Sequence, residues 1–352
     1  MGKQVLMNGN EALAEGAIRG GCQAYFGYPI TPQNELIEYM SEQMPQRGRV
    51  FIQAESEISS ISMVHGAAAT GTRAMTSSSS PGVSLMMEGI SYLGGCGLPA
   101  VLVNVQRAGP GLGGIAPAQA DYFQSVKGGW HGDYHMIVLA PNSVQEMHDF
   151  AHQAFALAEK YRILVMILAD GQLGQMMEPL ELRPEVGPAP DKDWALTGAK
   201  DRPRRIIRSY WAKNDDVEAN NRRIQDRLQR IRQNEVRFEK LNLDDAQVML
   251  VGFGSSARLC QGAIDELRQQ GLRAGLFRPI TLWPFPSDAL AACASKVKNI
   301  LVVELNAGQM IEDVRLAVGK QIPIHFLGRS GGNVMSVSDI AAEVRSLARG
   351  NQ

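Results

Sequence analysis

Short apolar runs alternate with amphipathic segments over the first 170 residues of the chain. Six of these runs have the length and composition of buried strands: residues 23–27, 50–53, 73–76, 98–105, 136–139 and 163–169. The segments between them carry apolar residues at helical spacing, and polar residues mark their starts, as Asn8 and Glu11 do with the spacing of a capping pair. Strands that alternate with helices predict an α/β fold with a parallel, doubly wound sheet.

A proline-rich stretch near residue 184 interrupts this rhythm, and a highly charged segment follows. Within it Ile224, Leu228 and Ile231 form a narrow apolar stripe among arginines. Such a basic helix either binds phosphate or serves as a solvated connector, and we favour the connector. Strand and helix patterns resume near residue 246. We therefore predict a first domain over 1–185, a charged helical connector over 186–243 and a second, smaller α/β domain over 244–352.

The composition is that of a globular protein and offers no electrostatic reason for a nucleic-acid or membrane partner. The 352 residues carry a formal net charge of -1, with 45% hydrophobic and 20% charged residues. No apolar run reaches the roughly 18 residues of a membrane helix, and the first residues lack the apolar core of a signal peptide, so a cytoplasmic location is expected. The four cysteines form no Cys-x-x-Cys pair, and no zinc or iron–sulfur motif is visible.

The turn at residues 27–32 connects the first buried strand to a helix. Thr31 is positioned to cap a helix whose first residue is Pro32. Turns at the carboxyl ends of strands are where open α/β sheets bind small ligands. A purely structural connection is the alternative interpretation of this turn.

Glu57 is the strongest candidate for a catalytic carboxylate. It follows a predicted buried strand and begins an apolar helix, where the helix dipole stabilises negative charge. Carboxylates also occur at helix starts for structural reasons. Glu55, two residues earlier, is the neighbour that could be mistaken for it.

Arg107 follows the most strongly predicted strand and precedes a glycine-rich loop over residues 108–114. Its planar guanidinium suits recognition of a carboxylate, although a strand-end arginine in water is the alternative. The serine run 77–80, followed by Pro81 and Gly82, lacks the lysine of a P-loop and predicts a tight polar turn that lines a ligand.

Two further patterns have weaker functional interpretations. His148 and His152 are spaced for one helix face, but no third metal ligand is evident, so no metal site is predicted. The glycine turn at residues 252–257 fits a dinucleotide pattern. The next strand ends in Arg278 instead of an acidic residue, so a domain-packing turn is favoured over NAD or NADP binding.

Several motifs together resemble the alpha subunits of 2-oxoacid:ferredoxin oxidoreductases, which are thiamine diphosphate enzymes. They lie at residues 28–32, 57–66, 76–86, 105–110, 278–286 and 304–309. The resemblance implies a pyrimidine-binding thiamine-enzyme domain followed by a domain similar to the C-terminal domain of transketolase. It implies that Glu57 contacts the aminopyrimidine ring, and that Arg107 and Thr31 bind the substrate carboxylate. The remaining cofactor contacts are then Tyr28, Pro29, Ile30, Ser78 and Ser79.

The sequence contains no Gly-Asp-Gly motif for the diphosphate, so it resembles half of a thiamine site. The resemblance implies a beta subunit that holds the diphosphate, Mg²⁺ and a [4Fe-4S] cluster, with gamma and ferredoxin-like delta subunits as further partners. Coenzyme A is then a co-substrate and ferredoxin the electron acceptor. A split transketolase-like enzyme and an NADP-binding or structural subunit are the alternatives.

The substrate is the least determined property of the sequence. The likeness is greatest to branched-chain (3-methyl-2-oxobutanoate) and 2-oxoglutarate enzymes. In the loop after Arg107, residues 111–114 depart from the family's usual Ser-Thr-Gly, which bears on selectivity. Residues 111–118 offer apolar groups and no charge, with Lys127 and His131 as the nearby cationic candidates. We therefore expect a branched aliphatic 2-oxoacid, with 2-oxoglutarate or pyruvate as the alternatives.

Overall fold

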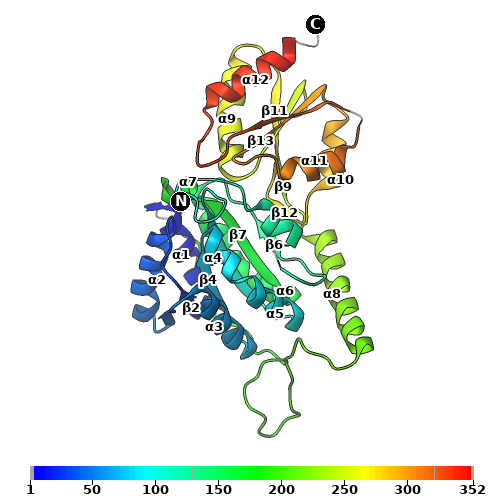
Figure 1. The fold of residues 1–352 in the computed structure, drawn as a ribbon. Helices are drawn as coiled ribbons and strands as arrows, with labels where there is room; N and C mark the ends of the chain where they lie inside the picture. The colour runs from blue at the N-terminus through cyan, green and yellow to red at the C-terminus, as the bar shows by residue number, and fades with distance from the viewer. Residues whose placement is uncertain (1–3, 129, 321, 350–352) are drawn as a thin grey trace.

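The computed structural model of the chain describes residues 4–128, 130–320 and 322–349. Within these ranges Figure 1 shows two α/β units, one above the other, with a long helix, α8, along the side of the first. Residues 1–3, which belong to the N-terminal stretch where no signal peptide is expected, lie outside the described residues. In the described part of the chain, no helix combines the length and the apolar character that a membrane crossing needs.

The first unit is built on a sheet of seven strands in the order β12-β6-β7-β5-β4-β2-β3 among the described residues. All strands of this sheet except β12 are parallel to their neighbours. Their bounds are β2 Ala24–Gly27, β3 Val50–Gln53, β4 Ala74–Ser78, β5 Ala100–Gln106, β6 Ile137–Leu139 and β7 Leu164–Asp170. The six strands predicted from the apolar runs are therefore present, with ends displaced by at most two residues, and the doubly wound α/β class is confirmed.

Helices connect these strands, and an antiparallel ribbon of β1 (Gln4–Asn8) and β8 (Met177–Glu181) lies beside them. The helices are α1 Gly9–Arg19, α2 Asn34–Gln46, α3 Glu57–Ala69, α4 Ser80–Leu85, α5 Met87–Cys96, α6 Val144–Tyr161 and α7 Gly171–Gln175, with a π-helix at Gln124–Gly128. The capping pair is confirmed, because the Asn8 side chain accepts from the Glu11 backbone and the Glu11 side chain accepts from the Asn8 backbone.

The predicted start of the second helix is wrong. Helix α2 begins at Asn34, and its N-cap is Gln33 without a side-chain cap, so Thr31 does not cap it. Tertiary contacts explain the difference. The carbonyl of Pro32 accepts from the Asn10 side chain, and the carbonyl of Thr31 accepts from Arg107, so neither begins the helical hydrogen-bond ladder.

The connector contains helix α8, Asn214–Asn234. Its buried residues are the three that the sequence singled out, Ile224, Leu228 and Ile231. They join the main hydrophobic core, while the remaining faces of the helix are polar. A helix with so narrow an apolar stripe packs on the domain along one face only. This is what we expect of a connector that lies along the side of a domain.

The second unit has a sheet of five strands in the order β14-β13-β10-β11-β9 among the described residues. The strands are β9 Phe238–Leu241, β10 Val248–Val251, β11 Ala274–Pro279, β13 Asn299–Glu304 and β14 Ile324–Gly328. The helices are α9 Gly254–Gln269, α10 Ser287–Ala294, α11 Met310–Val318 and α12 Val337–Arg349. Only β9 runs antiparallel to its neighbour in this described sheet.

Strand β12, Thr281–Trp283, belongs to the second unit by sequence but pairs antiparallel with β6 of the first sheet. The buried guanidinium of Arg278 also joins the units, since it pairs with Glu146 of α6 and with Glu239 of β9. The main hydrophobic core continues from one unit into the other. The domain boundaries at residues 185 and 243 remain predictions.

Candidate functional site

The carboxyl ends of four neighbouring strands meet at one edge of the first sheet. β5, β4, β2 and β3 are adjacent and parallel, so the residues that follow each of them gather there. Thr31 follows β2, Glu57 begins the helix after β3, Ser79 follows β4 and Arg107 follows β5. The topology therefore brings together residues that are up to 76 positions apart.

Glu57 is the first residue of α3, as the sequence predicts, and Ser56 caps the helix through its side chain. The residue is 5% exposed. Its carboxylate accepts one long hydrogen bond, 3.4 Å from the Ser78 hydroxyl. Glu55, in contrast, is exposed and accepts from the Ser59 hydroxyl, which lowers the pKa of its carboxyl group. Of the two carboxylates, Glu57 is the one that is buried and free to take a stronger partner.

Gly82 packs closely against Glu57 and Ser78. A Cβ atom added at Gly82 would lie 2.0 Å from the Ser78 hydroxyl and 2.4 Å from a Glu57 carboxylate oxygen, so only glycine leaves this approach open. The Ser79 hydroxyl is buried without a hydrogen-bond partner in the described structure. Two buried polar groups on this edge of the sheet, the Ser79 hydroxyl and the Glu57 carboxylate, therefore have unused hydrogen-bonding capacity.

Arg107 and Thr31 lie together. The Arg107 side chain is 7% exposed, and its Nη1 donates to the Thr31 carbonyl at 3.0 Å. Nη2 donates to the Leu112 carbonyl at 3.1 Å, while the buried Nε has no partner among the described residues. Since neither acceptor is charged, the guanidinium is oriented without being neutralised. The Thr31 hydroxyl, which accepts from Asn34 at 3.4 Å, is part of the same turn.

The glycine-rich loop folds back over Arg107. Arg107 and Pro117 form a backbone bridge, and the Gly114 N–H donates to the Ala108 carbonyl. The exposed residues at the tip include Leu112 and Ile115, 82% and 65% exposed. The loop therefore contacts Arg107 through its backbone, while its large apolar side chains, Leu112 and Ile115, face outward.

A buried polar cluster, Ser80, Asn104 and Asp121, was not predicted from the sequence. The Ser80 hydroxyl donates to Asp121 at 2.6 Å and accepts from the Arg107 backbone N–H at 3.0 Å. Asn104 donates to the same Asp121 oxygen at 2.9 Å. Burial raises the pKa of Asp121, and the Ser80 and Asn104 hydrogen bonds oppose that rise. One signal was available, because Asn104 is a polar residue inside a strand that is otherwise apolar up to its last residue, Gln106.

Beside this cluster lies a cavity of about 610 Å³ between the two units. The first unit lines it with residues of α4, the glycine-rich loop and the segment around Asp121, and the second unit with residues 305–309 and 330–331. Asp121 is the only ionisable residue in this lining. The cavity therefore offers no cation to a ligand among the described residues.

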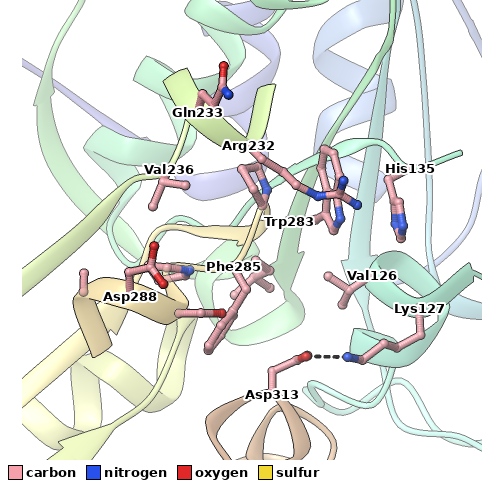
Figure 2. A pocket seen from close by; sticks show the side chains of 15 residues that line it. Val126, Lys127, His135, Arg232, Gln233, Val236, Trp283, Phe285, Asp288 and Asp313 are labelled. Atoms are coloured by element: carbon pink, nitrogen blue, oxygen red, sulfur yellow. Dashed lines mark hydrogen bonds and ion pairs between the residues drawn. The ribbon is translucent and has the colours of Figure 1, made fainter. Parts of the chain in front are cut away.

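Tyr28 and Pro29 are exposed on the turn after β2, and Ile30 is half-buried. They share the turn with Thr31, but the structure gives them no contact with Glu57. Lys127 and His131 do not line the 610 Å³ cavity. Lys127 pairs with Asp313 at a separate cavity of about 680 Å³ (Figure 2). His131 contacts Ser91.

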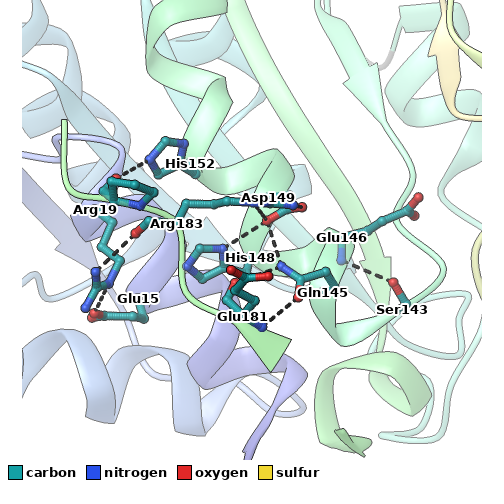
Figure 3. A network of polar contacts seen from close by, with 11 residues as sticks. Glu15, Arg19, Ser143, Gln145, Glu146, His148, Asp149, His152, Glu181 and Arg183 are labelled. Carbon is teal, nitrogen blue, oxygen red and sulfur yellow. Dashed lines mark hydrogen bonds and ion pairs between the residues drawn. The ribbon is translucent and has the colours of Figure 1, made fainter. Parts of the chain in front are cut away.

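The histidine pair belongs to a structural network. Figure 3 shows His148 bonded to Asp149, which also accepts from Gln145 and Arg183, while His152 bonds to a backbone carbonyl. No group of three or more potential metal ligands occurs among the described residues. Asp149 holds this part of the chain together through its hydrogen bonds to His148, Gln145 and Arg183.

The glycine turn of the second unit packs against the first. Ser255 donates to Asp170 at 2.7 Å, and Ser256 donates to Gln119 at 2.5 Å. Gln119 in turn donates to the Phe253 carbonyl at 2.7 Å. These contacts confirm the domain-packing interpretation of the turn.

The fold is that of the thiamine diphosphate enzymes, and its sheet edge carries a buried carboxylate and an un-neutralised arginine. Sequence comparison gives the family. The thiamine diphosphate-binding domain of pyruvate flavodoxin/ferredoxin oxidoreductases matches residues 15–232, and core domain II of pyruvate:ferredoxin oxidoreductase matches residues 246–340. The chain belongs to the family of 2-oxoacid:ferredoxin oxidoreductase subunits.

Relatives with assigned names agree with this placement. The ketoisovalerate oxidoreductase subunit VorB of Methanothermobacter marburgensis is 48% identical over 97% of both chains. The 2-oxoglutarate synthase subunit KorA of Methanocaldococcus jannaschii is 36% identical over 94% of this chain and 96% of its own. The family resemblance expected from the motifs is therefore confirmed.

Two solved structures share the fold. The 2-oxoglutarate:ferredoxin oxidoreductase from Magnetococcus marinus, solved with 2-oxoglutarate, coenzyme A and succinyl-CoA bound, has a TM-score of 0.89 and 26% identity. This chain aligns over 97% of its own length and spans 65% of that chain. A split-gene transketolase, an inactive beta4 tetramer, has a TM-score of 0.59 at 11% identity and shows the fold alone.

Proposed function

We propose that this chain supplies the pyrimidine-binding half of a thiamine diphosphate site in a 2-oxoacid:ferredoxin oxidoreductase that prefers a branched-chain 2-oxoacid. The observation that carries the proposal is the buried Glu57 carboxylate beside Ser78 and Gly82, at the sheet edge that also holds Arg107. The reaction converts a 2-oxoacid and coenzyme A to acyl-CoA and CO₂, and two electrons pass to ferredoxin. A cytoplasmic location is part of the proposal.

Each residue of the site has a role in this proposal. Glu57 holds a proton on a ring nitrogen of the cofactor, as a buried carboxylate with one weak hydrogen bond is suited to do. Ser78 and Ser79 line the ring, and Tyr28, Pro29 and Ile30 complete its surroundings with the partner chain. When bound, thiamine diphosphate supplies the nucleophilic carbon at which the 2-oxoacid is decarboxylated. Burial of this edge excludes water from the reaction.

Arg107 binds the substrate carboxylate, and Thr31 supports it. Two N–H groups of the arginine already hold backbone carbonyls, which fixes the plane of the guanidinium, and the Nε–H remains for an anionic oxygen. A preoriented donor costs less ordering when the substrate binds. The shared carboxylate of all 2-oxoacids is recognised in this way, so selectivity belongs to the contacts of the substrate tail.

A partner subunit supplies the rest of the site in this proposal. The sequence has no diphosphate or cluster motif, and the named relatives are subunits. We therefore assign the diphosphate, Mg²⁺ and the [4Fe-4S] cluster to a beta subunit, with gamma and ferredoxin-like delta subunits as further members. The decisive experiment is coenzyme A-dependent viologen reduction by this chain alone and with its partner. Activity only in the complex is expected, and full activity of the isolated chain would refute the shared site.

Two observations support a branched aliphatic substrate. The 610 Å³ cavity presents no cation among its described lining residues, and a second substrate carboxylate left unpaired there would cost several kcal/mol. The relatives at 47–48% identity are named ketoisovalerate oxidoreductase subunits. Values of kcat/KM for 3-methyl-2-oxobutanoate, pyruvate, 2-oxoglutarate and an aryl pyruvate test this choice.

The second candidate substrate is 2-oxoglutarate, because relatives at 32–38% identity are named 2-oxoglutarate synthase subunits. A clear preference for it in the same substrate panel would show that the partner chain brings a cation to the tail of the cleft. The NADP-binding and transketolase-like alternatives have less support, because the glycine turn is filled by domain contacts and the transketolase likeness is one of fold alone.

A further inference from the structure

An arginine-rich pocket lies on the first unit, at the edge of the sheet opposite to Glu57 and Arg107. It has a volume of about 410 Å³, and it is lined in part by Gly95 and Cys96 at the end of α5 and by Arg162 at the end of α6. These residues immediately precede β5 and β7, whose carboxyl ends point to the candidate active site. A seven-residue strand spans roughly 20 Å, so the two sites are separate.

Five guanidiniums converge on this arginine pocket, and its lining contains no Asp or Glu. They belong to Arg162, Arg205, Arg208, Arg223 and Arg227. Within the described residues, none of the five lies within 4.0 Å of a carboxylate oxygen. The five arginines therefore gather in one pocket without a paired carboxylate, so this cluster is electrostatically unmatched.

Neutral groups hold the arginines in place. The Arg162 Nε donates to the Gly97 carbonyl at 3.1 Å, and the Arg227 Nη1 donates to the Arg162 carbonyl at 2.9 Å. The Arg205 Nη1 donates to the carbonyls of Lys192 and Ala195, at 3.2 and 2.8 Å. Backbone carbonyls orient a guanidinium but do not cancel its charge, so the positive potential of the pocket persists.

Three of the guanidiniums lie over indole rings. Arg208 lies 4.1 Å and Arg223 5.9 Å from the centroid of the Trp211 ring, and Arg162 lies 4.5 Å from that of Trp194. Stacking fixes the plane of a guanidinium while its N–H groups stay available at the edge. The buried Nε1–H of Trp211 has no hydrogen-bond partner among the described residues. The pocket is therefore lined by guanidinium donors and by Trp211, whose indole N–H has no partner among the described residues.

The clustered positive charge also affects the pKa of the arginines. Burial, with the positive charges of Arg162, Arg230 and Arg223, lowers the pKa of Arg227 to about 10. Burial likewise lowers the pKa of Arg162, although Asp193 in the adjacent segment acts in the opposite direction. A bound anion would offset the repulsion that the neighbouring arginines exert on Arg227.

We propose that the arginine pocket binds the phosphate groups of a small phosphorylated ligand, at a site distinct from the thiamine site. Phosphate oxygens accept from several guanidiniums at once, and a diphosphate carries enough charge to match the cluster. The indole rings already carry stacked guanidiniums, so a nucleobase adds little to the affinity. The alternative occupant is an acidic segment of a partner protein, and the experiment below distinguishes it from a phosphorylated ligand.

The test uses the complex of this chain with its partner subunit, preloaded with one equivalent each of thiamine diphosphate, Mg²⁺ and coenzyme A so that the proposed active site is occupied. It titrates pyrophosphate, inorganic phosphate and ADP by calorimetry, against sodium chloride at equal ionic strength. We expect one saturable site for each copy of this chain, with pyrophosphate and ADP bound similarly and inorganic phosphate more weakly. The variant with Arg208→Gln and Arg223→Gln should bind pyrophosphate about tenfold more weakly or worse.

The matched control is Arg204→Gln with Arg222→Gln, which removes the same charge. Both arginines are exposed, neither lines the pocket, and Arg222 pairs with Glu218. This control should bind pyrophosphate within about twofold of the parent. An equal loss in both double variants would reduce the effect to general electrostatics and overturn the proposal.

Trp211→Phe provides a second probe if the double variant does not fold. It keeps every charge and removes one neutral donor, so pyrophosphate should bind about three- to tenfold more weakly. Unchanged affinity would overturn the proposal. So would the absence of saturable binding to the parent complex, and failure of the pocket variant to assemble with its partner would then identify an acidic protein surface as the occupant.

Discussion

Glu57 and Glu55 are two carboxylates only two residues apart with opposite surroundings, which makes them a matched pair. Glu57→Gln should leave folding and assembly intact and lower turnover by about 10²–10⁴-fold, because an amide cannot hold the ring proton through its charge. Glu55→Gln, at an exposed position, should stay within a few-fold of the parent. Steady-state viologen reduction measures both. Equal effects of the two substitutions would mean that the wrong carboxylate has been chosen.

Arg107→Lys replaces a planar fork with a single ammonium group. The loss of charge-assisted hydrogen bonds should lower kcat/KM by about 10–100-fold, and by a similar factor for every 2-oxoacid, since all of them share the carboxylate. The measurement is the substrate panel repeated on the variant. A change in the ranking of the substrates would show instead that Arg107 contacts the tail.

Asp121 predicts a pH dependence with a definite sign. Burial raises its pKa above the ordinary value of 3.8, so its contribution to stability is complete below that value and is lost as the pH rises through the folded-state pKa. Asp121→Asn cannot titrate and should remove this loss. The difference in Tm, variant minus parent, should therefore increase from pH 4 to pH 7. A difference that is constant with pH would show that the carboxyl group is protonated, or ionised, throughout.

The single residues of the site were predictable to different degrees. Glu57 and Arg107 were found because positions after a strand and at a helix start can be read from local periodicity. Thr31 was placed correctly in the turn but given the wrong local role, because Arg107 and Asn10, distant in sequence, decide where α2 begins. Asp121 was not predicted, because its partners Ser80 and Asn104 lie 41 and 17 positions away in the sequence.

The glycine-rich loop depends on its backbone geometry more than on its side chains. Gly113 has a φ of 58°, and a Cβ atom there would lie 1.8 Å from the Ala108 carbonyl oxygen. Gly113→Ala should therefore displace the loop from Arg107 and raise KM for 2-oxoacids. Gly114→Ala is the control, since an added Cβ meets no atom within 4 Å and its backbone is not left-handed. Kinetics at saturating coenzyme A separate the two, and equal KM values would contradict this role of the loop.

The parallel strands were predictable because each is an apolar run of adequate length, whereas β9 and β12 were not. Both are as short as β3 and β6, but charged residues interrupt the apolar pattern of β9, and both strands exist through pairing with partners distant in sequence.

The buried Arg278 links the two units of the molecule. Arg278→Met should leave Glu146 partly buried without its cation and destabilise the junction by about 3–5 kcal/mol. Arg222→Met, which breaks an exposed pair with Glu218, is the control and should have little effect. Thermal unfolding of the complex reports both. A stable Arg278→Met variant would mean that the remaining contacts between the units, including the pairing of β12 with β6, hold them together without this ion pair.

Strand β12 also protects the first sheet from its own edge. Without it, the hydrogen-bonding groups of β6 would face solvent beside Ile137, Val138 and Leu139, which are all buried in the intact chain. An open, apolar strand edge is a template for association between copies. A chain that ended before the second unit would therefore tend to aggregate even if its own helices and strands formed. The second unit thus protects the first from association between copies by covering the edge of its sheet.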